Sequence, residues 1–390
     1  MANHGGAPQP IDLKGIFDQT HGSDAVTVGG ATFVAVTGRD KFGGEGYGPS
    51  RVRVFRVSAA GERSELPPLL QDESHTEGTA MASLGQAPCV GYTVSRPLRS
   101  GTSVIACLEG EGWRELALPA AYRTGNVAGL ERFGESLYVL MHASPTRTQV
   151  KAGRRAAYRL LRWAGSRWRT AGPPIVEDPT SRTEPTARLG RSYGPGGSSR
   201  PLLGLEFHER GGRVSVLELS GNRWRAAVPE RLTEGLRIGT APVSVGSKLL
   251  FAVSRRSAPM QDSLAIFSNG RVEHIAVPGA SLGLLNTNFT SGKLWIGWSS
   301  LHPPDAKNRN QVDIRAASID MRTRSVTTVR ELAVWRFPRT FVAIENPRII
   351  DISGHPYALF TDFSSFVDGP PAAAQPILRP IESFPTVKTG

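Results

Sequence analysis

Short apolar runs, each bounded by polar residues and turn formers, recur from one end of the chain to the other. They are TFVAV, CVGYTV, LYVLM, LLGLEF, LLFAV, LWIGW and YALF, beginning at Thr32, Cys89, Leu137, Leu202, Leu249, Leu294 and Tyr357. Helical periodicity is nearly absent, and Gly (43) and Pro (29) are abundant. Short apolar runs between turn residues are typical of β-strands. The pattern therefore predicts an all-β protein with very little helix.

A longer unit repeats around these runs. Six of the seven runs are followed by two alternating strands with a short Gly, Asn or charged turn between them, as a β-hairpin requires. These hairpins begin at Val52, Val104, Tyr158, Val214, Leu264 and Ile314. The apolar runs lie about 45 to 65 residues apart, which is the length of a four-stranded propeller blade with its loops. We expect a seven-bladed β-propeller of four-stranded antiparallel blades that occupies residues 1–390 as one domain.

The last unit ends near Phe384 and is one strand short. The segment PIDLKGIF, from Pro10, can supply the missing strand. Closing the ring with strands from both ends of the chain removes the exposed sheet edges that promote aggregation. We therefore expect the N-terminal strand to close the ring and residues 1–9 and 385–390 to form flexible tails.

The repeat resembles the generic blade of kelch, WD-repeat and sialidase-like propellers over essentially the whole chain. The nearest match to the sialidase Asp-box is GSRWRTAG around Trp168, which lacks the Asp. The double glycine of kelch repeats and the Trp-Asp pair of WD repeats are missing at regular positions. The resemblance implies an architecture and no specific family. A Trp-Arg step recurs at Trp113, Trp168 and Trp224, where a packing role between blades outweighs ligand stacking.

Charge adds a functional expectation. The chain carries 46 Lys and Arg against 34 Asp and Glu, a formal net charge of +12 with a pI near 10.2. Such a protein attracts polyanions, and the planar guanidinium of Arg suits carboxylate, sulfate and phosphate. No apolar stretch reaches the roughly 18 residues needed to span a bilayer. The start Ala2-Asn3-His4 resembles a mature terminus behind an added Met, so we expect an extracellular or periplasmic protein whose leader is absent.

The two cysteines, Cys89 and Cys107, fall in adjacent strands of one predicted hairpin. If Val94 faces Thr102 across the loop between the strands, the same antiparallel register places Cys89 opposite Cys107. The pair could form a disulfide, which would indicate an oxidising compartment. Two small buried thiols explain the same positions equally well.

Loop lengths differ between the two faces of the predicted ring. The turns from first to second strand are mostly tight, whereas the opposite face carries long loops, and long loops on a rigid scaffold are where binding usually occurs. A single loop Arg is most often solvated or paired with a neighbouring acid, but His and Arg recur around the mouth of the channel on this face. Candidate substrate-binding residues are His21, Arg39, Arg96, Arg123, Arg182, Arg237, Arg255, His302 and Arg339.

Imidazole and phenol groups on this face suggest acid-base chemistry. His75, His142 and His208 are candidate catalytic bases, and Tyr122, or Tyr47, is a candidate proton donor. Beside an Arg that neutralises a carboxylate, such groups suit β-elimination on a uronic-acid polymer. Some polysaccharide lyases are similar in having a His, Tyr and Arg site on a seven-bladed propeller, an analogy of fold and residue type alone.

Other functions use different residues. A glycoside hydrolase would need two carboxyl groups across the channel, and the candidates are Asp24, Asp72, Glu73, Glu77, Glu177 and Glu184. A non-catalytic scaffold or lectin-like module that binds an acidic protein or glycan is the main alternative. We expect no cofactor and no metal, because neither a dinucleotide or phosphate-binding fingerprint nor a metal-ligand motif occurs. Nucleic acid is not an expected partner, because aromatic residues do not interleave with the basic ones, and we expect a monomer.

Overall fold

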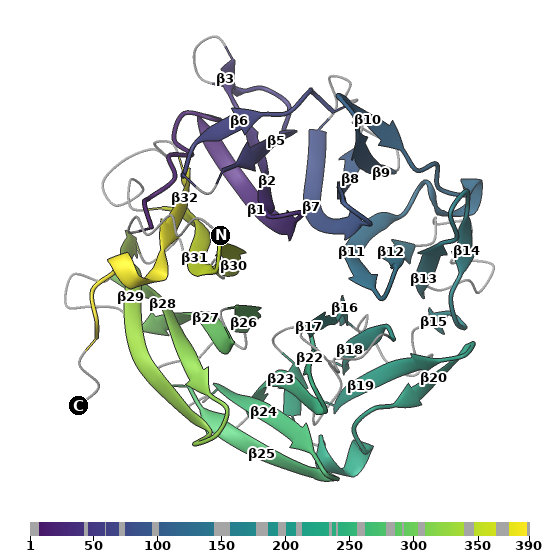
Figure 1. Ribbon diagram of the computed structural model, residues 1–390, viewed down its shortest axis with the longest axis vertical. Helices are drawn as coiled ribbons and strands as arrows, with labels where there is room; N and C mark the ends of the chain where they lie inside the picture. Colours follow the sequence, from purple (N-terminus) through teal and green to yellow (C-terminus); the bar gives the residue numbers. More distant parts are fainter. Residues whose placement is uncertain are drawn as a thin grey trace, which may run out of the picture.

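The computed structural model describes residues 8–42, 46–58, 60–69, 75–95, 101–143, 157–176, 186–193, 200–207, 213–233, 236–238, 241–255, 262–277, 285–290, 292–302, 309–338, 347–363 and 374–387. The described residues form a ring of seven β-sheets around a central channel, the seven-bladed β-propeller that the sequence predicts (Figure 1). Each sheet is a blade whose first strand lies at the channel and whose last strand lies at the rim.

The first three blades follow the predicted order. Blade 1 has β1 (Gln19–Val28), β2 (Ala31–Arg39), β5 (Arg51–Val57) and β6 (Arg63–Glu65), with a small hairpin, β3 (Lys41–Phe42) and β4 (Gly46–Tyr47), between its second and third strands. Blade 2 has β7 (His75–Leu84), β8 (Ala87–Ser95), β9 (Thr102–Glu109) and β10 (Gly112–Glu115). Blade 3 has β11 (Asn126–Phe133), β12 (Ser136–Ala143), β13 (Ala157–Trp163), β14 (Trp168–Thr170) and β15 (Ile175–Val176).

The remaining blades complete the circle. Blade 4 has β16 (Thr186–Leu189), β18 (Leu202–Phe207), β19 (Arg213–Ser220) and β20 (Arg223–Ala226). Blade 5 has β17 (Arg191–Tyr193), β21 (Leu236–Ile238), β22 (Val243–Val245), β23 (Lys248–Arg255), β24 (Asp262–Ser268) and β25 (Arg271–Ala276). Blade 6 has β26 (Leu285–Thr290), β27 (Lys293–His302), β28 (Arg309–Asp320) and β29 (Ser325–Pro338), and blade 7 has β30 (Arg348–Ile352), β31 (His355–Asp362) and β32 (Gln375–Pro380). The described helices are three short 3₁₀ turns, η1 (Ala120–Tyr122), η2 (Glu230–Leu232) and η4 (Ile381–Ser383).

The N-terminal segment closes the ring, as the sequence predicts. Ile11 forms an antiparallel bridge with Leu378 at the outer edge of blade 7, and its backbone N–H donates to the Leu378 carbonyl at 2.9 Å. Leu13, Ile16 and Phe17 follow it into the core between blades 7 and 1, where each is 3% exposed or less. At the other terminus, Thr386 forms a bridge with Arg330 on β29.

Hydrophobic residues join each blade to the next. Within the described residues, seven clusters of buried apolar side chains correspond to the seven interfaces between blades. The second strands are buried on both faces, which explains why the sequence shows them as continuous apolar runs. The Trp-Arg step is confirmed as a packing element, because the indole N–H of Trp113, Trp168 and Trp224 donates to a backbone carbonyl at the end of the preceding blade, at 2.8, 2.9 and 3.1 Å.

The predicted register of blade 2 is also confirmed. Val94 pairs with Thr102 and Cys89 pairs with Cys107 in the antiparallel β8–β9 ladder. The two cysteines form a disulfide, which settles the choice that the sequence leaves open. The tight turns between first and second strands are present too. In blade 1, Gly29 and Gly30 form this turn with φ angles of +60° and +74°, at which residues with a Cβ are strained.

Blade 4 departs from the simple repeat. Its inner strand β16 ends at Leu189, and the chain crosses at Gly190 to pair as β17 with β22 of blade 5, in parallel. A Cβ on Gly190 would lie 2.6 Å from the Pro242 carbonyl oxygen, so only glycine allows the two backbones to approach this closely. The sequence pattern does not predict this crossing, which brings Arg191 to the channel wall.

Candidate functional site

Strand direction places the predicted site residues that the structure describes at one end of the ring. The first strand of a blade starts, and its second strand ends, on the face that carries the long loops. Four of these residues lie in described strands: His21 in β1, His75 in β7, Arg237 in β21 and Arg255 at the end of β23. The structure describes their backbone positions but not their side chains. Four other predicted residues lie outside the described part of the chain: Arg96, Arg182, His208 and Arg339. Four of the carboxylates considered for a hydrolase also lie outside it: Asp72, Glu73, Glu177 and Glu184.

His142 has the most developed surroundings of the predicted catalytic residues. It lies near the end of β12, and it pairs in register with Asn126 on β11 and with Tyr158 on β13. Residues paired across antiparallel strands point to the same side of a sheet. The rings of His142 and Tyr158 are in contact, with 4.6 Å between their centroids. An amide, an imidazole and a phenol therefore form a row across blade 3, which we call the blade 3 row.

Tyr122 and Arg123 precede this row in the chain. Tyr122 belongs to η1 and is partly buried against the core between blades 2 and 3, so its ring packs with apolar side chains. Arg123 is exposed, and its Nε donates to the Leu118 carbonyl at 3.0 Å. Its backbone carbonyl accepts from Ser103 at 2.8 Å, which ties the segment before Asn126 to blade 2. Arg123 thus presents a cation three residues before the blade 3 row.

His302 is held by a buried acid in blade 6. Its Nε2 lies 2.8 Å from Oδ2 of Asp313, a residue that is 3% exposed. Asp313 also accepts from Arg315 at 2.6 Å and from Gln311 at 2.9 Å. The imidazole itself is 40% exposed, so a buried carboxylate fixes the orientation of a solvent-accessible ring. This arrangement can position an imidazole for proton transfer or for binding an anion.

Arg39, at the end of β2, makes a local contact in blade 1. Its Nε donates to Oε1 of Gln19 at 2.6 Å, which joins the first and second strands at the long-loop end. His302 and His142 lie in blades 6 and 3, on different sides of the channel (Figure 1). The predicted residues are therefore distributed around the ring, and the blade 3 row is the described group that combines an imidazole with a phenol.

A second charged cluster, which the sequence pattern did not single out, lies on the channel wall. It consists of four residues from four different sheets: Asp24 on β1, Glu131 on β11, Arg191 on β17 and Arg348 on β30. Arg191 Nε lies 2.5 Å from Oε1 of Glu131, and Arg348 Nη1 lies 3.0 Å from Oδ1 of Asp24. Arg191 Nη2 lies 4.0 Å from the same Asp24 oxygen. We call these four residues the channel cluster.

Two members of the channel cluster, Glu131 and Arg191, line a cavity of about 320 Å³ near the short-turn end of the inner strands, together with Asn288 and Asp351. Asp24 is 2% exposed, and its Oδ2 accepts the backbone N–H of Met81 on the next blade at 2.9 Å. Burial raises the pKa of Glu131 to about 7 and outweighs the opposite effect of Arg191. Asp24 was considered from sequence as one of many carboxylates, whereas Glu131, Arg191 and Arg348 were missed because their convergence depends on the ring.

Among the described residues, no group of three or more His, Cys, Asp or Glu side chains could hold a metal ion. None of the described helices has the length and apolar character of a membrane-spanning segment.

Comparisons with known proteins agree on the fold. No family model and no curated protein matches this chain. Hadza microbial sialidase Hz136 aligns with 94% of this chain and 66% of its own, at 10% identity and a TM-score of 0.50. Trypanosoma rangeli sialidase, solved with sialic acid, aligns over 77% of this chain and 52% of its own, at 12% identity and a TM-score of 0.45.

A third neighbour is Bombyx mori GH32 β-fructofuranosidase, which aligns over 93% of this chain and 89% of its own, at 10% identity and a TM-score of 0.39. This chain thus spans about two thirds of the first sialidase and about half of the second. At such identities the likeness concerns the fold alone. The protein is a seven-bladed β-propeller whose structural neighbours include sialidases and other carbohydrate-active enzymes, with no specific family identified.

Proposed function

We propose that this propeller acts on an acidic carbohydrate and cleaves a uronic-acid polymer by β-elimination at the long-loop end of blade 3. The observation that carries the proposal is the contact between His142 and Tyr158, whose ring centroids lie 4.6 Å apart, with Asn126 in register beside them. A β-eliminating site needs a base, an acid and a group that neutralises the substrate carboxylate. The blade 3 row and Arg123 supply these three functions.

Each side chain has a defined role in the proposed reaction. His142 removes the proton from the carbon next to the uronate carboxylate, and the electron pair forms the new carbon–carbon double bond. The bond to the glycosidic oxygen breaks, and the Tyr158 hydroxyl gives its proton to that leaving oxygen. The Asn126 amide and the Arg123 guanidinium donate hydrogen bonds to the carboxylate, which makes the neighbouring carbon more acidic. Proton transfer from His142 to Tyr158 restores the starting state, and no water is consumed.

Tyr158 replaces Tyr122 as the proton donor in this proposal. Tyr122 packs against the core between blades 2 and 3, whereas Tyr158 lies beside the imidazole. The net charge of +12 favours the approach of a polyanionic substrate. An extracellular or periplasmic location fits a polymeric substrate, and the Cys89–Cys107 disulfide supports an oxidising compartment.

The proposal is tested with a panel of uronic-acid polymers, including polygalacturonate and alginate, and the ultraviolet absorbance of unsaturated uronates. We expect one polymer to give a steady rise in absorbance. His142→Ala and Tyr158→Phe should each lower kcat/KM by about a hundredfold or more. His274→Ala, in the outer strand β25, is the matched control and should leave kcat/KM unchanged. Absence of signal across the panel, or full activity of His142→Ala, would contradict the proposal.

A further inference from the structure

Blade 3 carries a second polar row at its opposite end. Tyr138 on β12 pairs in register with Arg162 on β13, and Arg162 pairs with Arg169 on β14. The three side chains therefore share one side of the sheet. Arg162 and Arg169 are exposed, whereas Tyr138 is 8% exposed and packs edge-on against Phe133. We call Tyr138, Arg162 and Arg169 the short-turn row, because they lie at the tight-turn end of the blade.

The other blades with a Trp-Arg step provide an internal reference for this row. Arg169 follows Trp168, as Arg225 follows Trp224 in blade 4 and Arg114 follows Trp113 in blade 2. In blade 4 the residue opposite Arg225 is Glu218, which gives a pair of opposite charge. In blade 2 the residue opposite Arg114 is Cys107, which is uncharged in its disulfide. Among these three blades, blade 3 alone places two guanidinium groups opposite each other.

Two like charges directly opposite each other destabilise a sheet unless a counter-charge is present. Within the described part of the chain, neither Arg162 nor Arg169 has an acidic partner. Glu135, which lines the cleft beside this row, binds Arg132 at 2.8 Å, and Glu109 binds Arg114 at the same distance. Among the described residues, no carboxylate is bound to the short-turn row, so it offers a positive charge to a ligand.

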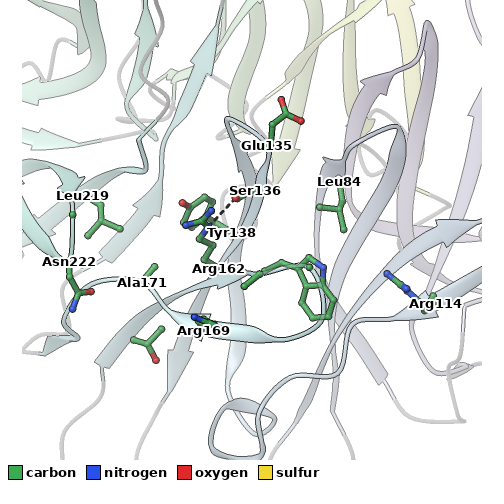
Figure 2. Close-up of a pocket in the computed structure, with 15 residues that line it drawn as sticks. Leu84, Arg114, Glu135, Ser136, Tyr138, Arg162, Arg169, Ala171, Leu219 and Asn222 are labelled. Atoms are coloured by element: carbon green, nitrogen blue, oxygen red, sulfur yellow. Dashed lines mark hydrogen bonds between the residues drawn. The ribbon is translucent and has the colours of Figure 1, made fainter.

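The row opens into a cleft of about 700 Å³ that extends to the neighbouring blades 2 and 4. Figure 2 shows the Nε of Arg162 bonded to Oγ of Ser136, at 3.0 Å, beside the Tyr138 ring. This hydrogen bond orients the guanidinium and leaves its terminal nitrogens for a ligand. Asn222, from the hairpin turn of blade 4, lines the cleft as well and accepts the backbone N–H of Gly172 through its Oδ1 at 2.9 Å. A volume of this size suits a few sugar rings rather than a single small ion.

We propose that this cleft binds the acidic group of a polysaccharide, with Arg162 and Arg169 holding its carboxylate or sulfate. Paired guanidinium groups bind such oxyanions through charge-assisted hydrogen bonds. Ser136, Asn222 and the polar edge of Tyr138 provide partners for sugar hydroxyls. The cleft lies at the opposite end of blade 3 from the blade 3 row, so it would contact a stretch of polymer other than the one being cleaved. The choice of a glycan ligand rests on the proposed function, whereas the oxyanion site rests on the arginine pair alone.

Binding is measured by calorimetry on the Tyr158→Phe variant, so that catalysis does not consume the ligand. The probes are an oligogalacturonate, a heparin-derived oligosaccharide that carries sulfate, inorganic sulfate and polyglutamate of similar charge. We expect at least one oligosaccharide to bind, and Arg162→Ala and Arg169→Ala each to weaken that binding about tenfold or more. Arg225→Ala is the matched control in blade 4 and should bind as the parent does.

The probes separate the possible sources of the anion. Binding of the oligogalacturonate alone assigns a carboxylate ligand, and binding of the heparin fragment alone assigns a sulfate ligand. Tighter binding of polyglutamate than of either oligosaccharide would overturn the glycan assignment. Equal losses in Arg162→Ala and Arg225→Ala, or no binding of any probe at low salt, would overturn the site itself. Because this experiment needs no turnover, its result is independent of whether the propeller eliminates uronates.

Discussion

Glu131 on β11 of blade 3 and Arg191 on β17, the strand that crosses to blade 5, meet at the channel wall, with 2.5 Å between Oε1 of the glutamate and Nε of the arginine. Burial raises the pKa of Glu131 from 4.5 to about 7. The folded protein therefore holds a proton that the unfolded chain releases between these two pH values. The free energy of unfolding contains a contribution from Glu131 that is complete below about pH 4.5 and is lost as pH rises through about 7.

Removal of this titration should flatten the pH profile of stability. Glu131→Gln keeps the shape of the side chain but cannot ionise. Between about pH 5 and about pH 8 the parent should lose about 3 kcal/mol that the variant does not lose. Urea denaturation at both pH values measures the difference. Parallel pH profiles for the two proteins would show that Glu131 titrates at its ordinary pKa.

Asp313 should be important for the stability of blade 6. It is 3% exposed and accepts from His302, Gln311 and Arg315. Asp313→Asn leaves the half-buried Arg315 guanidinium without its counter-charge, and we expect a loss of about 3 kcal/mol in unfolding free energy. Glu109→Gln, which breaks an exposed pair with Arg114, is the control and should cost less than about 1 kcal/mol. Similar costs for the two variants would exclude a special role for the Asp313 network.

Closure of the ring by the N-terminal segment can be tested at Leu13. This residue is 1% exposed in the core between blades 7 and 1. Leu13→Ala should lower the unfolding free energy by about 3 kcal/mol, because the cavity cannot collapse around a closed ring. Lys14→Ala changes the exposed neighbour and should lie within about 0.5 kcal/mol of the parent. A loss at Leu13 no larger than at Lys14 would mean that the segment contributes little to closure.

The sequence predicts the architecture well because the information is local and repeated. The apolar second strands, the tight Gly turns and the Cys89–Cys107 register each follow from neighbouring residues, and the ring multiplies the signal seven times. The missing strand of the last unit points to Ile11 by simple counting. Blade number and closure therefore required no knowledge of distant contacts.

The candidate site is less predictable because it depends on distant strands. His142 was identified from its loop, but its partner Tyr158 lies on β13, across a long connection, and only the ladder places the two rings together. Glu131 and Arg191 are 60 residues apart in sequence. Their contact depends on the crossing at Gly190, which no periodicity reveals. Local patterns specify the blades, whereas the groups that meet between blades follow from the geometry of the ring.

We propose that the blade 3 row eliminates uronates without using water. The most direct test is digestion of the best polymer of the panel in water labelled with ¹⁸O, followed by mass spectrometry of the products. Elimination at the blade 3 row should give unsaturated products that carry no label from the cleavage step, and His142→Ala should form none. Saturated products with one labelled oxygen per cleaved bond would identify a hydrolase and contradict elimination.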